Sequence, residues 1–132
     1  MAGTAADCVS DSTTLCLNGR FSVQLSWTMP QGLPGPPTGQ PQPAEAVVLS
    51  EAAGYFWFFD SSNVEFVVKV LDGCALNHAW WVFGTSLTSL PWTLTVKDVA
   101  TGDSFTYPGE QGVGLPPPPY LQETNLFSGS CP

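Results

Sequence analysis

The chain has 132 residues, and eleven acidic against three basic residues give it a net charge of −8 at pH 7. So few Lys and Arg cannot neutralise a phosphate backbone, which excludes nucleic acid as a partner, and no apolar run approaches the roughly 20 residues that span a bilayer, which excludes membrane insertion. The length is that of one ordinary domain, residues 1–132, and thirteen Gly and thirteen Pro favour short strands and turns over helices.

The N-terminal part of the chain predicts an extended segment, one strand and a long loop. Residues 1–14 are polar and are expected to be extended. From Leu15 to Trp27 the large apolar residues fall on odd positions. This period of two is typical of a half-buried strand, in which Asn18-Gly19 predicts a bulge or bend. Residues 30–43 are so rich in Pro and Gly that they predict a loop.

The most apolar stretch, residues 54–74, predicts a hairpin at the centre of the fold. An aromatic run over 55–59 ends at a polar turn over 60–63, and a largely β-branched run follows over 64–71. Both faces of the returning strand are at least partly apolar, as in a central strand that is covered on both sides. A short strand over residues 46–50 leads into this hairpin.

The C-terminal half predicts four more strands. They are a strand over residues 79–83 that ends at Gly84, a hairpin of residues 92–97 and 104–107 around a turn at 98–103, and an edge strand within 121–131. A polar connection at Asn77-His78 precedes the first of them. A second Pro-rich segment, residues 108–119, ends in consecutive prolines and is interpreted as a rigid spacer.

These elements indicate an all-β fold. Six to eight short strands linked by hairpins, without helical periodicity long enough for a crossover, favour an antiparallel β-sandwich. It is Ig-like only in the loose sense, because the Cys-Trp-Cys pattern of true immunoglobulin domains is missing. A small barrel is the alternative architecture.

The four cysteines predict disulfides rather than a metal site. Cys8, Cys16, Cys74 and Cys131 include no C-x-x-C pair, and only one His could complete a zinc site. An even number, with one member near each end, fits two disulfides and export to an extracellular or cell-surface location. We expect Cys8 to pair with Cys131 and Cys16 with Cys74, although four cysteines allow three pairings. Buried free thiols in a cytosolic protein are the alternative.

Three stretches, LCLNGRFSVQLSW, GYFWFFDSSNVEFVVKVLDGC and WVFGTSLTSLPWTLTVKDVATG, precede a Cys-Pro end. Together they resemble a domain that recurs in exported proteins of environmental bacteria, the most specific strings being W-F-F-D-x-x-N-V-E and V-K-V-L-D-G-C. The resemblance covers most of the chain and implies a module that occurs alone or joined to larger secreted proteins. It implies no established activity. The Pro-rich segments 30–43 and 116–119 depart from that domain's shorter connections.

No set of residues predicts catalysis. His78 is the only histidine, and no G-x-S-x-G motif or paired nucleophile accompanies it. Asp60, Glu65 and Asp72 could supply carboxylates for glycoside hydrolysis. The odd spacing of Glu65 and Asp72, however, places them on opposite faces of a strand, and Asp60 is a turn former. We therefore expect a protein that is not an enzyme and has no catalytic residues.

Calcium is the one cofactor that the sequence suggests. One turn offers several of the oxygen ligands that Ca²⁺ prefers. The candidate ligands there are Asp60, Ser61, Asn63 and Glu65. Asp98 and Asp103 could form a second cluster. Neither set has EF-hand spacing, and turns are rich in such residues for conformational reasons, so the simpler expectation is no cofactor.

Two further features favour contacts with a partner. Lys69 lies in mid-strand, where it can blunt an edge, pair with Glu65 or form an amide cross-link to an Asn or Asp of a neighbouring strand. Trp80 and Trp81 are adjacent, so on a strand they point to opposite faces. One of them can reach the surface and stack on a sugar or anchor a protein. The alternative is that the Pro-rich loops cover this second face.

The sequence thus indicates a non-catalytic extracellular or cell-surface module for binding or adhesion, with a protein or carbohydrate partner. One alternative is a structural subunit that assembles with copies of itself into a surface filament through edge strands. Another alternative is a peptidase inhibitor that presents the loop at residues 30–43.

Overall fold

The computed structural model describes residues 8–29, 40–88, 90–109 and 120–132, which contain ten strands. The first five are β1 (Leu15–Leu17), β2 (Phe21–Trp27), β3 (Gln42–Pro43), β4 (Glu45–Val48) and β5 (Ala53–Trp57). The others are β6 (Phe66–Asp72), β7 (Trp80–Ser86), β8 (Trp92–Asp98), β9 (Ser104–Gly109) and β10 (Tyr120–Leu126). A short helix α1 (Cys74–Asn77) and a 3-10 turn η2 (Ser128–Ser130) complete the described elements. No helix in these ranges is long and apolar enough to cross a membrane.

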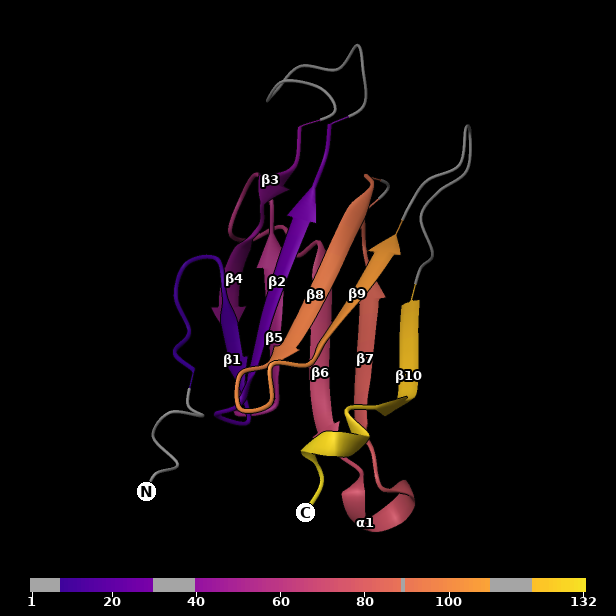
Figure 1. The fold of residues 1–132 in the computed structure, drawn as a ribbon. Coiled ribbons are helices and arrows are strands. Elements are labelled where there is room, and N and C mark those ends of the chain that lie inside the picture. Colours follow the sequence, from indigo (N-terminus) through magenta and orange to yellow (C-terminus); the bar gives the residue numbers. More distant parts are fainter. Residues whose placement is uncertain (1–7, 30–39, 89, 110–119) are drawn as a thin grey trace.

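The strands form two antiparallel sheets in two layers, which confirms the predicted β-sandwich (Figure 1). Sheet A has the order β1-β2-β8-β9, with β3 also paired to β2, and sheet B has the order β10-β7-β6-β5-β4. The number of strands exceeds six to eight for two reasons. The strand predicted from Leu15 to Trp27 is divided into β1 and β2, and Gln42–Pro43, at the end of the predicted loop, pairs with Ser26 and Trp27 as β3.

Asn18 and Gly19 reverse the chain between β1 and β2, where the sequence predicts only a bulge or bend. Their φ angles are 56° and 64°, which is the geometry of a two-residue hairpin turn, and the Arg20 N–H donates to the Leu17 carbonyl. The Asn18 side-chain amide also donates to the Val70 carbonyl at 2.7 Å. The turn therefore fastens sheet A to sheet B.

The core lies between the sheets, because every second residue of the long strands points inward and is buried. Aromatic rings join the two layers: the centroid of Phe21 lies 4.7 Å from that of Trp80, and the centroid of Phe66 lies 4.7 Å from that of Trp92. Burial of one such large side chain contributes about 1.5 to 3 kcal/mol. These contacts are therefore a large share of the stability of a small domain.

The predicted central hairpin is present as β5 and β6, and β6 is the middle strand of sheet B. The strands are shorter at the turn than the sequence predicts. β5 ends at Trp57, so that Phe58 and Phe59 leave the ladder and pack on Trp27 with centroid distances of 4.9 and 4.8 Å. Stacking on a residue of the other sheet explains why this aromatic run does not continue as a strand.

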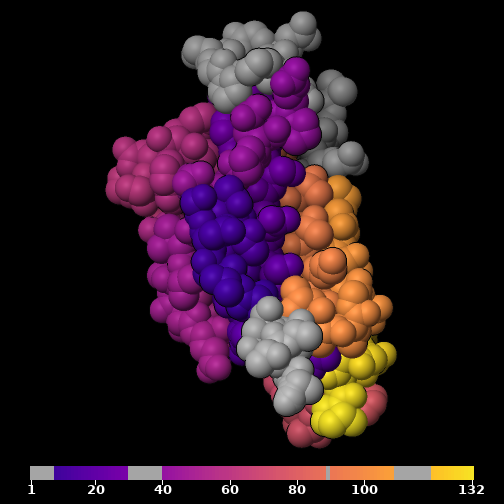
Figure 2. Space-filling model, turned by 60° about the vertical axis from the view of Figure 1, so that its left-hand side comes forward, coloured from indigo at the N-terminus to yellow at the C-terminus, as the bar shows by residue number. Residues whose placement is uncertain are grey.

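The segment before β1 covers one edge of the sandwich. The Ala46 N–H of edge strand β4 donates to the Ser12 carbonyl at 2.8 Å. Leu15 packs so closely over Gly54 that a Cβ at that position would lie 2.6 Å from its methyl groups. Figure 2 shows residues 8–29, which include β1 and β2 (indigo), between β4 and β5 of sheet B (magenta) and the strands β8 and β9 (orange). The edge strand β4 is therefore not free to pair along this part of its length.

Other predicted boundaries differ from the structure. β7 continues past Gly84 to Ser86. Gly84 is accommodated within the strand because it has no Cβ and so leaves room for the Phe66 ring, which packs directly over it. The connection at Asn77-His78 is the end of α1, which His78 closes in the left-handed conformation. The last strand ends before η2 instead of reaching the C-terminal cysteine.

The two Pro-rich segments lie mostly outside the described residues. Of the predicted loop at 30–43 the structure describes residues 40–43, and of the predicted segment at 108–119 it describes residues 108 and 109, at the end of β9.

All four cysteines form disulfides, as predicted, but the predicted pairing of Cys8 with Cys131 and of Cys16 with Cys74 is wrong. The bonds join Cys8 to Cys16 and Cys74 to Cys131. Cys16 points out of sheet A, between the inward Leu15 and Leu17, and therefore cannot reach the other sheet. Cys74 begins α1 at the end of the sandwich, where the C-terminal segment also lies (Figure 1).

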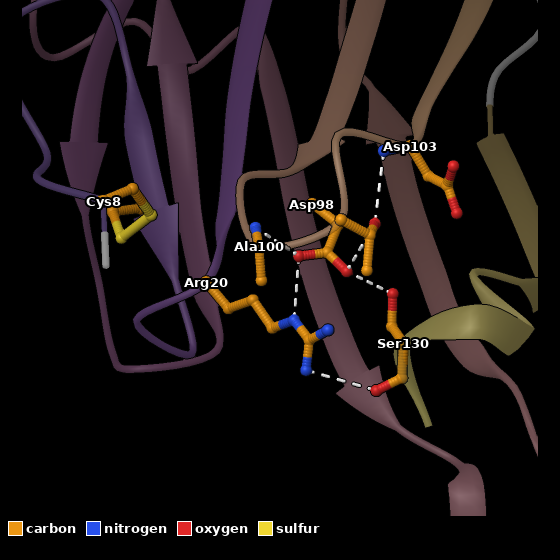
Figure 3. A network of polar contacts seen from close by, with 8 residues as sticks. Cys8, Arg20, Asp98, Ala100, Asp103 and Ser130 are labelled. Atoms are coloured by element: carbon orange, nitrogen blue, oxygen red, sulfur yellow. Dashed lines mark hydrogen bonds and ion pairs between the residues drawn. A yellow bond between two sulfur atoms is a disulfide. The ribbon is translucent and has the colours of Figure 1, made fainter. Parts of the chain in front are cut away.

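A buried ion pair holds this end of the sandwich together (Figure 3). Arg20 Nε donates to Asp98 Oδ1 at 2.8 Å, and its Nη1 donates to the Ser130 carbonyl at 3.2 Å. Asp98 is fully buried and also accepts hydrogen bonds from the Ala100 N–H and the Thr101 and Ser130 hydroxyls. The network joins the β1–β2 turn, the β8–β9 turn and η2.

The network lowers the pKa of Asp98. Burial alone raises the pKa, but the hydrogen bonds from Arg20, Ser130, Ala100 and Thr101 outweigh it and bring the value from 3.8 to about 2. A carboxyl group with a lowered pKa stabilises the fold above its unfolded pKa, and this stabilisation is lost as the pH falls through the folded pKa. The stabilisation is about 2 kcal/mol at neutral pH and disappears between about pH 4 and pH 2.

We predict that Asp98→Asn lowers the free energy of unfolding at pH 7 by about 2 to 4 kcal/mol, because Arg20 and its partners lose the buried charge. The free energy of unfolding of the variant should also fall less than that of the wild type between about pH 4 and pH 2, because the variant has no Asp98 carboxylate to protonate. Urea denaturation at a series of pH values measures both effects.

Asp103→Asn is the matched control, because the Asp103 carboxylate is exposed and points away from Asp98 (Figure 3). It should keep the wild-type profile. If Asp98→Asn also kept that profile, the ion pair would not be the source of the stability.

Candidate functional site

The outward side of sheet B carries a strip of apolar and aromatic residues, which we call the B face. Successive side chains of a strand point to opposite faces, so in β4 to β7 every second residue points away from the core. These outward residues make up the B face. The B face consists of Glu45, Val47, Ala53, Tyr55, Trp57, Val67, Lys69, Leu71, Trp81, Phe83 and Thr85. Most of these side chains are half-buried, while Lys69 and Thr85 are exposed. The face is therefore largely apolar although it faces away from the core.

The outward side of sheet A has a different composition. Its central positions on β2 and β8 are Ser22, Gln24, Ser26, Thr93, Thr95 and Lys97. This is the usual pattern for an antiparallel sheet with one solvated face. The apolar character of the B face thus distinguishes sheet B from sheet A, and a partly exposed apolar patch of this kind is typical of an interaction site.

A hollow of about 180 Å³ opens on the B face around Ala53. Ala53 lies opposite Lys69 across β5 and β6, and its small side chain leaves space between its larger neighbours. Val67, Phe83 and Thr85 line the remaining sides. The Lys69 ammonium lies 5.3 Å from the centre of the Phe83 ring, a distance at which a cation and the negative ring face attract each other. The hollow thus combines an aromatic wall with one positive charge.

Trp81 is fixed in place at one end of the B face. Its indole Nε1 donates to Asn77 Oδ1 at 2.8 Å, and Asn77 Nδ2 donates to the Thr124 carbonyl of β10 at 2.7 Å. Gly73 lies so close beneath the indole that a Cβ there would collide with it. Phe83 packs against it edge-on, with centroids 6.4 Å apart. Since its polar atom is satisfied within the protein, the indole is a rigid and half-buried surface for contact.

The adjacent tryptophans point to opposite faces of β7, as the sequence predicts. Trp80 is 8% exposed and belongs to the core, where it meets Phe21 and is unavailable to a partner. Trp81 is the one that reaches the surface. Of the two tryptophans considered as partner contacts, only Trp81 therefore remains a candidate.

The cross-link predicted for Lys69 has no partner directly across either neighbouring strand. The residues opposite it are Ala53 on β5 and Phe83 on β7, neither of which carries an amide or carboxyl group. Glu65 precedes β6 and is 6% exposed, with its carboxylate accepting from Asn63 Nδ2 at 3.3 Å. In the described residues Lys69 makes no ion pair with it.

Two of the candidate calcium ligands, Asp60 and Glu65, accept hydrogen bonds from other groups of the chain. Asp60 Oδ1 accepts from the Ser62 N–H and hydroxyl, both at 2.8 Å, and these bonds lower its pKa. Burial raises the pKa of Glu65, an effect that a hydrogen bond from Thr88 opposes. The described parts of the chain contain no group of three or more His, Cys, Asp or Glu that could hold a metal.

The carboxylates of Asp98 and Asp103, considered as a second calcium cluster, do not point towards a common site. Asp98 is occupied by Arg20, while the Asp103 carboxylate points away from it (Figure 3). His78 lines a different hollow, beside Asp72 and the Cys74–Cys131 disulfide. None of these residues adjoins the B face hollow.

The sequence contained a signal for the B face that the prediction used only for the fold. The apolar character of both faces of β6 predicts cover on both sides, whereas the described residues cover only the side with Phe66, Val68 and Val70. Ala53, which creates the hollow, and Asn77, which holds Trp81, have no recognisable signal of their own, because their roles arise from residues that are distant in sequence.

Comparison with protein-family models, with curated proteins and with solved structures found no match for this chain.

We predict that Asn77→Ala loosens the Trp81 indole without unfolding the domain. Loss of a hydrogen bond worth roughly 1 kcal/mol should increase hydrogen exchange of the Trp81 indole N–H by about five- to tenfold. Proton NMR of the indole N–H signals in deuterated buffer measures this rate. Asn125→Ala is the control: Asn125 Oδ1 accepts from Asn77 Nδ2 only at 3.5 Å, and Asn77 keeps its 2.7 Å hydrogen bond to the Thr124 carbonyl without it. Equal exchange in both variants would show that Asn77 does not hold Trp81.

Proposed function

We propose that this protein is a non-catalytic extracellular binding module whose B face contacts the partner. The observation that carries this proposal is the row of aromatic and aliphatic side chains on the outward positions of sheet B, beside a polar outward side on sheet A. Aromatic residues that expose part of a ring are the side chains most enriched at binding sites.

Several properties of the described residues support binding rather than catalysis. Trp81 is held rigidly, so little conformational entropy is lost when a partner packs on it. Lys69 places one positively charged donor amid largely apolar surface, an arrangement that can orient a ligand. The carboxylates considered for catalysis accept hydrogen bonds from nearby groups of the chain: Asp60 from Ser62, Glu65 from Asn63, and Asp72 from the Cys74 N–H.

The two disulfides support a location outside the reducing cytosol. Cys74–Cys131 closes a separation of 57 residues and ties η2 to α1. Cross-links of this kind persist in oxidising compartments. A partner at the cell surface or in the surrounding medium is therefore the expected one.

Self-assembly through edge strands is less well supported. β4 is covered in part by the segment that includes Ser12, and β10 has a register shift between Glu123 and Leu126. Both features blunt a sheet edge against further pairing. The net charge of −8 also repels copies of the chain from one another.

We predict that a negative charge placed on the B face weakens binding of the partner. Thr85→Glu adds a carboxylate at an exposed strand position beside the hollow, and Gln24→Glu makes a similar change on the outward side of sheet A. Biolayer interferometry of the full chain against a panel of purified polysaccharides and extracellular proteins should show saturable binding that Thr85→Glu weakens at least about tenfold and Gln24→Glu leaves unchanged.

Two results would overturn the proposal. One is equal binding by the two variants. The other is chemical conversion of a bound partner, which mass spectrometry of the recovered partner would reveal.

A further inference from the structure

The B face has the chemistry of a surface for sugar rings. We infer that it binds an uncharged polysaccharide chain, with Trp81 as the stacking surface and Lys69 as a hydrogen-bond donor to hydroxyl groups. This inference rests on the proposed function and names the class of partner.

Aromatic rings are arranged on both sides of β6. Tyr55 and Trp57 project from β5, and Trp81 and Phe83 project from β7. The register staggers them along β6: Tyr55 is level with Val67, whereas Phe83 is level with Lys69. Tyr55 and Phe83, the nearest members of the two pairs, are therefore about 12 Å apart, and Trp57 and Trp81 are about 22 Å apart. A sugar ring presents apolar C–H groups on its faces, and these groups pack on the electron-rich face of an aromatic ring. The two pairs can therefore contact separate rings of one extended chain that crosses β6 obliquely, which a single small sugar could not do.

The size of the hollow also favours a polymer. Its 180 Å³ is below the range of about 300 to 1,000 Å³ that encloses a complete small-molecule ligand. It can accept one ring of a longer chain while neighbouring rings lie on the open face. The polar groups around it suit hydroxyl recognition: the Lys69 ammonium, the Thr85 hydroxyl and the Gln122 amide, which is exposed on β10 opposite Phe83.

The charges on the face argue against the other partners. Of its residues only Lys69 and Glu45 are charged. A polyanion would meet one Lys on a chain of net charge −8, and a basic protein would find one carboxylate on this face. A second copy stacked on the same face about a two-fold axis through its centre would bring Lys69 towards its counterpart, in addition to the repulsion between two acidic chains. An uncharged chain of sugars avoids each of these penalties.

Affinity electrophoresis of the full chain in native gels tests the inference. The gels contain β-glucan, xylan or galactomannan as uncharged polysaccharides, and alginate or polygalacturonate as anionic ones. We expect retardation by at least one uncharged polysaccharide, with an affinity that changes less than about twofold between low and high salt, because no ion pair to the partner is formed.

Variants locate the interaction. Trp81→Ala should weaken binding about tenfold, and Trp81→Phe should retain most of it, since a ring remains for stacking. Lys69→Met should weaken binding about three- to tenfold, while Lys97→Met, the same change on the exposed side of sheet A, should have no effect. Thermal melts confirm that each variant is folded.

Three outcomes would overturn the inference. They are retardation by none of the uncharged polysaccharides, preference for the anionic ones with strong salt dependence, and equal effects of Lys69→Met and Lys97→Met. If instead the chain bound a protein of the panel above in a manner sensitive to Thr85→Glu, the proposed function would stand while the sugar assignment would fall.

Discussion

The central strands of sheet B are apolar on both faces, but the part of the chain that the structure describes covers only one of them. The inward side, with Phe66, Val68 and Val70, packs against sheet A and forms the core. The outward side, with Val67, Lys69 and Leu71, has no described element packed upon it in the order of the sheets. Because apolar side chains that face water give up the free energy of burial, the B face is a feature that stability alone does not explain. The functional interpretation depends on this asymmetry.

The end of the sandwich that carries α1 connects stability to the site. Asp98, Arg20 and Ser130 fix η2 to the turns of sheet A, and the Cys74–Cys131 disulfide ties η2 to the first residue of α1. The last residue of α1, Asn77, then holds the Trp81 indole. Loss of the Arg20–Asp98 ion pair should therefore also loosen the Trp81 indole, because η2, the disulfide and α1 connect the two, although the ion pair and the indole are not in direct contact.

Much of the fold was readable from the sequence because strand alternation is a local signal. The period of two in residues 21–27 and 92–97, and the polar turn at 60–63, predicted strands and turns close to those observed. The disulfide pairing was wrong because it depends on which ends of the strands meet, and no local pattern encodes that. The Asn18-Gly19 reversal was available as a hairpin signal, but the continuing alternation on both sides of it favoured a single strand.

The candidate site was only partly readable. Alternation correctly separated the directions of Trp80 and Trp81, but it could not tell which side of β7 faces the other sheet. The hollow at Ala53 and the role of Asn77 arise from contacts between strands and between α1 and β10. Such contacts exist only once the fold is known.

The most direct measurement compares Val67→Thr with Val68→Thr, the same nearly isosteric change at adjacent residues on opposite faces of β6. Val68 is buried in the core, so a hydroxyl there should lower the free energy of unfolding by about 1 to 3 kcal/mol. Val67 belongs to the B face, and its substitution should change this free energy by less than about 0.5 kcal/mol. Urea denaturation of the two variants gives both values. Equal losses of stability would show that the outward side of sheet B is packed as part of the core, and would contradict its assignment as a binding face.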